Sequence, residues 1–78
     1  MTDIRLQTGP FGLRSIEVYE AGAGELSVDC VTGFDGKRSM VVVSDARGVR
    51  IADAVVDNDN PEIEEAKQWL LDFTRCSL

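Results

Sequence analysis

Glycine-containing turns divide residues 3–56 into short segments, and apolar and polar side chains alternate in several of them. The alternation is clearest in residues 14–20 and 25–32, where a period of two is typical of strands with one buried face. In the second of these, Leu26, Val28 and Cys30 are expected to face inward. The other expected strands are residues 3–7, 39–44 and 49–56. Asp53 interrupts the apolar pattern of the last one, which suggests a bulge there. We therefore expect an antiparallel β-meander of four to five strands.

One helix is expected after the strands, from Pro61 to Arg75. Asn60 is a suitable capping residue, proline is favoured at the first helical position, and glutamates crowd the first turns, where the helix dipole favours negative charge. One helical arc gathers the apolar side chains that should pack across the sheet: Ile63, Ala66, Trp69, Leu70 and Phe73. Leu71 lies off this arc and is expected to be exposed. The fold class is therefore α+β.

The length of 78 residues leaves room for a single domain, residues 1–78, with a thin core. An apolar fraction of 44% argues against disorder. No apolar run approaches the roughly 20 residues of a membrane span, and the N-terminus has neither the basic nor the apolar region of a signal peptide. We expect a protein without a membrane partner in the cytoplasm, where both cysteines would be thiols.

The residues needed for common catalytic and metal sites are missing from the sequence. There is no histidine, which excludes Ser-His and Cys-His nucleophile pairs, and Cys30 and Cys76 lack a second cysteine at metal-ligand spacing. Residues 57–60 resemble the start of a calcium loop, but Pro61 falls at the third ligand position and Glu62 where glycine is required. The sequence thus predicts neither an enzyme nor a cofactor or metal site.

The net charge of −6 disfavours direct binding to nucleic acid, which depends on cations that neutralise phosphates. On the hairpin expected from residues 14–32, the carboxylates of Glu17, Glu25 and Asp29 should share one solvent face with Tyr19. Such a row could bind a basic groove of another protein. The alternative is that these carboxylates only keep the sheet face solvated.

Self-association is a second way in which the chain could interact. Cys76 lies in the last helical turn and should be exposed, and together with Leu71 and Leu78 it could support a symmetric homodimer. An unpaired outer strand could do the same by extending the sheet.

Taken whole, the chain resembles the small acidic proteins by which phages and mobile elements inhibit bacterial defence, anti-CRISPR proteins in particular. The resemblance lies in its size, its acidity, the meander of residues 14–56 and the lone helix of residues 61–75. It implies a non-enzymatic inhibitor that acts in the host cytoplasm and blocks the DNA-binding surface of a CRISPR surveillance complex. Glu17, Glu25 and Asp29 are then the first candidate contacts, with Asp57 and Asp59 next. The alternative is a small homodimeric structural or assembly protein of phage or host.

Overall fold

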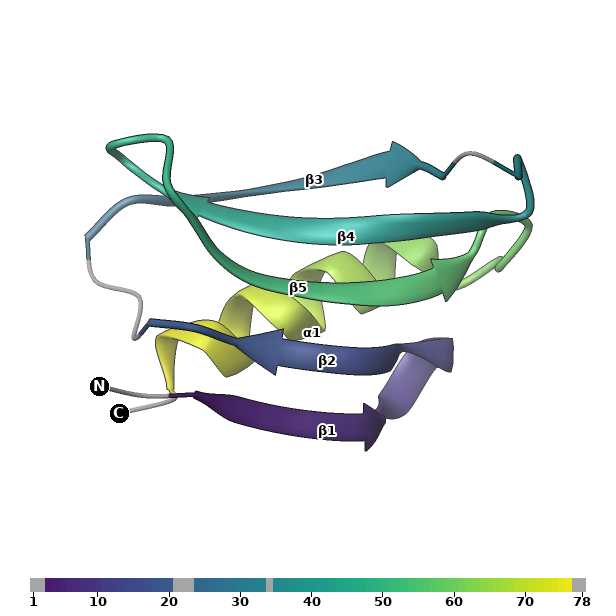
Figure 1. Cartoon of the computed structure of the whole chain (residues 1–78), viewed down its shortest axis with the longest axis horizontal. Helices are drawn as coiled ribbons and strands as arrows, with labels where there is room; N and C mark the ends of the chain where they lie inside the picture. The colour runs from purple at the N-terminus through teal and green to yellow at the C-terminus, as the bar shows by residue number, and fades with distance from the viewer. Residues whose placement is uncertain (1–2, 21–23, 34, 77–78) are drawn as a thin grey trace.

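The computed structural model describes residues 3–20, 24–33 and 35–76. Figure 1 shows a single twisted sheet with one helix lying across one of its faces. In chain order the elements are β1 (Ile4–Thr8), the 3-10 turn η1 (Pro10–Gly12), β2 (Arg14–Val18), β3 (Leu26–Thr32), β4 (Arg38–Asp45), β5 (Arg50–Asp57) and α1 (Ile63–Arg75). All strand pairs are antiparallel, so the expected α+β class is confirmed. No helix in the described ranges is long and apolar enough to cross a membrane.

The strand order is β1-β2-β5-β4-β3, which separates the two strands expected to form the first hairpin. β2 pairs with β5 instead, with Glu17 opposite Asp53, and β3 pairs only with β4. The chain therefore runs from β2 to the far edge of the sheet before β3, β4 and β5 return as a meander (Figure 1). The expected hairpin of residues 14–32 is not formed.

The core lies between the sheet and α1. Alternate side chains of β4 and β5 face the helix, as their register shows for Val41 opposite Ala54 and Val43 opposite Ala52. These residues are buried together with Ala66 and Leu70 of α1. Because successive side chains of a strand point to opposite faces of the sheet, the residues between them, such as Met40 and Val42 of β4, point to the face that α1 leaves open.

The strand register is irregular at two places next to this core. Between Arg14 and Glu17, β2 has one residue more than β5, and Ser15 within this bulge has a left-handed φ of 50°. On β5, Ile51 is the extra residue, since Val43 is opposite Ala52 whereas Ser44 is opposite Arg50. The sequence placed the irregularity at Asp53, two residues too late. Asp53 lies in regular register opposite Val42.

Asn60 connects the start of the helix to η1. Its amide nitrogen donates to the carbonyl oxygen of Phe11 (2.9 Å), and its Oδ1 accepts from the backbone N–H of Glu62 (2.7 Å). The adjacent Gly12 has a φ of 79°, and a Cβ there would collide with the Asn60 amide. Helix α1 itself begins at Ile63, two residues later than expected, so Asn60 acts on the turn before the helix rather than as its N-cap.

Replacing Asn60 with alanine should lower the free energy of unfolding by about 1–2 kcal/mol, because it removes two hydrogen bonds that fix the entry into α1. Urea titration followed by circular dichroism measures this loss. The neighbouring Asp59 has no side-chain partner in the described structure, so Asp59→Ala should change the stability by less than about 0.5 kcal/mol. Equal losses in the two variants would contradict the bridging role of Asn60.

Two burial predictions are wrong. Cys30 does point to the helix side of the sheet, opposite Val41, but it is exposed because β3 is an edge strand. Leu71 was expected to be exposed, yet it is half-buried and packs against the core. The helix therefore buries a wider arc than its sequence pattern suggested, with Trp69 and Phe73 stacked at a centroid distance of 4.9 Å on its other flank.

Candidate functional site

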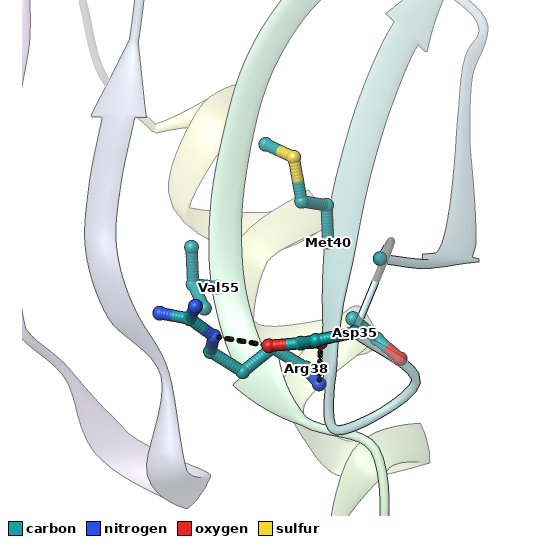
Figure 2. Close-up of a pocket in the computed structure, with 6 residues that line it drawn as sticks. Asp35, Arg38, Met40 and Val55 are labelled. Carbon is teal, nitrogen blue, oxygen red and sulfur yellow. Dashed lines mark hydrogen bonds and ion pairs between the residues drawn. The ribbon is translucent and has the colours of Figure 1, made fainter.

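The face of the sheet opposite α1 carries two adjoining hollows. Figure 2 shows Met40 of β4 and Val55 of β5 side by side in the first, which has a volume of about 320 Å³, with Arg38 folded onto Asp35 at its rim. The second hollow, of about 360 Å³, shares Met40 and extends over Val42 to Val31 and Arg50. Apolar side chains form the floor of both, and no described group of three or more His, Cys, Asp or Glu residues is arranged to hold a metal ion.

The charged groups at the rim of these hollows are bonded to one another. The Nε of Arg38 donates to Asp35 at 3.3 Å, and the backbone N–H groups of Lys37 and Arg38 donate to the same carboxylate. These backbone bonds are the main cause that lowers the pKa of Asp35 below its ordinary value. The guanidinium of Arg50 lies 3.8 Å from Asp53. The charged side chains at the rim are thus held in hydrogen bonds and ion pairs within the chain.

Tyr19 and Asp53 form a polar pair between β2 and β5 on the same face. The tyrosine hydroxyl donates to Oδ2 of Asp53 at 2.7 Å, and Asp53 is only 7% exposed. This bond, reinforced by desolvation of the phenol and by the negative charge of Asp53, raises the pKa of Tyr19 to about 12. The hydroxyl is therefore held in a hydrogen bond within the chain, which makes Tyr19 a weak candidate for contact with a partner.

The cations of the chain are largely neutralised within it. Six of the eight Lys and Arg side chains form ion pairs, namely Arg5, Arg14, Arg38, Arg47, Arg50 and Lys67. Arg47 is the most engaged, since it contacts both Asp45 and Glu20, and the bond to Asp45 is the main cause that raises its pKa. Only Lys37 and Arg75 lack a carboxylate partner within the described ranges. The sheet therefore presents few free positive charges.

Apart from Asp72, whose carboxylate accepts a hydrogen bond from the neutral side chain of Gln68, the unpaired negative charge of the described residues lies in two places. Within the described structure, Asp59, Glu62 and Glu65 have no side-chain hydrogen bond or ion pair, and all three are exposed around the start of α1. We call these three the helix-start carboxylates. Glu25 and Asp29 are likewise exposed and unpaired, at and just before β3. The free charge that a partner would meet is mainly negative.

The structure does not bring together the carboxylate row that the sequence predicted. Glu17 lies on β2 and Asp29 on β3, three strand spacings or roughly 14 Å apart across the sheet. Glu17 also accepts from Nε of Arg5 at 3.1 Å, and Asp57 pairs with Arg14 at 2.6 Å. Of the predicted contacts, Glu25, Asp29 and Asp59 remain free for a partner, whereas Glu17 and Asp57 would first have to release an arginine.

The predicted self-association patch is not assembled as expected either. Leu71 packs against the core, while Cys76, at the end of α1, is exposed as predicted. Leu78 lies outside the described residues. Sequence reasoning also passed over Glu62 and Glu65, because their position in the first helical turn was explained by the helix dipole alone.

Comparison of the chain with protein-family models, with curated proteins and with solved structures finds no match.

Proposed function

We propose that this chain is a non-enzymatic inhibitor that binds a basic, nucleic-acid-binding surface of a protein complex in the cytoplasm. The observation that supports the proposal is the unequal pairing of its charges: six of eight cations are held in internal ion pairs, whereas the helix-start carboxylates and the carboxylates near β3 are free. A partner rich in arginine and lysine meets unpaired acids that need not break an existing bond to bind it.

The helix-start carboxylates are the strongest contacts in this proposal. They come from a short stretch of chain, residues 59–65, at the start of α1. Asn58, just before this stretch, donates to the carbonyl oxygens of Gly36 and Lys37 in the neighbouring exposed turn. A cluster of fixed negative charges speeds the encounter with a basic surface and can displace phosphates from it. The resemblance to anti-CRISPR proteins narrows the partner to a CRISPR surveillance complex of the host.

The test is an electrophoretic assay of a type I interference complex on its target DNA. The protein should prevent DNA binding at saturating concentration. The triple variant Asp59→Asn, Glu62→Gln, Glu65→Gln should require at least about ten-fold more protein for the same inhibition, because three charge-assisted contacts are lost.

The matched control removes three carboxylates that are exposed and already paired: Asp3→Asn, Glu20→Gln, Glu64→Gln. It has the same net charge as the first triple variant, so it separates a located contact from general acidity. Inhibition should be close to that of the natural sequence. Full DNA binding in the presence of excess natural protein would refute the proposal for that complex.

A homodimeric assembly protein is the second candidate function, and one observation favours it. No strand of the described residues pairs with the outer edge of β3, and Val31 on this strand is 55% exposed. A pull-down from host lysate separates the two functions, because an inhibitor retrieves a nuclease complex whereas an assembly protein retrieves copies of itself or structural proteins.

A further inference from the structure

The outer edge of β3 carries a row of backbone groups that no described strand pairs. The N–H of Gly33 donates to the carbonyl oxygen of Arg38 at 2.7 Å, and the register continues without a break from Thr32 opposite Ser39 to Leu26 opposite Asp45. Hydrogen-bonded pairs alternate along an antiparallel ladder, so the backbone groups of residues 31, 29 and 27 point to β4. Those of Val28, Cys30 and Thr32 therefore point away from the sheet. In Figure 1, β3 forms the outermost strand on that side.

β3 has few of the features that commonly protect an edge strand. Natural sheets use short edge strands, charged residues, proline or bulges for this purpose. β1, at the other edge, is five residues long and carries Arg5, which is paired with Asp3 and Glu17. β3 is seven residues long with a regular register, and Asp29 is its one charged residue. Of the two edges, β3 is the one suited to accept another strand.

We propose that β3 pairs with β3 of a second copy of this chain, antiparallel and about a two-fold axis at Cys30, so that the two sheets become continuous. Two-fold symmetry makes one residue face its own copy. An axis at Asp29 would place two carboxylates directly opposite each other, which is destabilising. An axis at Cys30 moves each Asp29 opposite Val31 of the second copy and makes the outward backbone groups of Cys30 a hydrogen-bonded pair.

The charges next to β3 indicate a second copy rather than an unrelated strand. With the axis at Cys30, Glu25 of one copy lies near the turn of residues 35–38 of the other. This turn has a net positive charge, because its one acid, Asp35, is already paired with Arg38, while Lys37 has no carboxylate partner in the described structure. Glu25 and Lys37 both lack an ionic partner in the described parts of one copy. Antiparallel pairing brings these complementary groups near each other twice, once at each end of the paired strands.

This dimer does not depend on the inhibitory function, because the helix-start carboxylates are not part of β3. It also differs from the dimer that the sequence suggested, since it uses neither Leu71 nor Cys76. An inhibitor and an assembly protein could both dimerise in this way.

The first experiment measures the molar mass by sedimentation equilibrium, on the full chain with Cys76→Ser. We expect a reversible dimer. Adding Thr32→Pro should weaken it by about ten-fold or more, because proline removes an outward N–H that pairs with the second copy but makes no bond within its own sheet. Thr32→Ala keeps this N–H and should dimerise as before. The proposal would be overturned if the Cys76→Ser protein with Thr32 unchanged were a monomer at millimolar concentration. It would also be overturned if the Thr32→Pro and Thr32→Ala variants associated equally.

The second experiment tests the register and does not depend on the folding of the proline variant. In a hydrogen-bonded antiparallel pair the Cα atoms are about 5.5 Å apart, within the range that a disulfide spans. Two equivalents of copper(II) phenanthroline, each of which accepts one electron as the two thiols lose their protons, should therefore link Cys30 to Cys30 rapidly in the Cys76→Ser protein. The control carries Ser27→Cys with Cys30→Ser and Cys76→Ser. Its thiols would be six positions apart in the register, roughly 20 Å, and should not link. Equal linking of the two proteins would overturn the proposed axis.

Discussion

Tyr19 should keep its phenolic proton up to about pH 12 in the folded protein, well above the ordinary tyrosine value of 10.0. The main cause is the 2.7 Å hydrogen bond from its hydroxyl to Asp53, which ionisation would remove. Loss of the proton would also place a phenolate beside a carboxylate that is itself mostly buried. The expected result is a titration midpoint of the Tyr19 phenol near pH 12, which would show that the Tyr19–Asp53 hydrogen bond exists in solution.

The measurement is direct because Tyr19 is the one tyrosine in the sequence. Its phenolate absorbance can be followed in the ultraviolet while circular dichroism confirms at each pH that the fold persists. Asp53→Asn removes the negative charge but keeps an oxygen that can accept the hydrogen bond, so the midpoint should fall toward 10. A midpoint near 10 in the folded natural protein would show that the Tyr19–Asp53 bond is absent.

The same raised pKa makes the stability depend on pH in a defined direction. Because the pKa of Tyr19 is higher in the folded than in the unfolded chain, its contribution is complete below pH 10 and is lost as the pH rises through about 12. Tyr19→Phe lacks the hydroxyl, so it should show a flatter decline between pH 10 and 12. At neutral pH it should be less stable by about 1 kcal/mol, a modest loss because the ring is 39% exposed.

Replacing Leu70 with alanine should lower the free energy of unfolding by about 3 kcal/mol. Leu70 is fully buried between α1 and the sheet, and removing a buried leucine side chain costs both its transfer free energy and the cavity that is left. Small domains have a total stability of only about 5–15 kcal/mol, so this one change removes a large share of it. Urea titration at neutral pH measures the loss.

Leu71→Ala is the matched control, because it removes the same atoms from the next position of the helix. Leu71 is half-buried at the edge of the core, so its loss should be about 1 kcal/mol. Similar losses for the two variants would mean that α1 is rotated about its axis relative to the sheet described here.

The sequence by itself determined the elements of this protein. The alternation in residues 14–20 and 25–32 predicted strands, and the apolar arc of residues 63–73 predicted the helix. Gly48, with a φ of 81°, lies in the glycine-containing turn that was expected between residues 39–44 and 49–56. These signals are local: they depend on the period of the side chains and on the conformations that a glycine permits. The same signals predicted the α+β class, and the composition of the sequence predicted the acidic character of the surface.

Only the tertiary structure decided which strands are neighbours. Alternation fixes which side chains share a face but is equally compatible with β2 beside β3 or beside β5. Because β2 joins β5, Glu17 and Asp29 are separated, Asp53 becomes buried next to Tyr19, and Cys30 lies on an exposed edge. The same holds for the candidate site. Which carboxylates are free depends on arginines that approach from distant parts of the chain, such as Arg14 with Asp57, and no local pattern encodes such contacts.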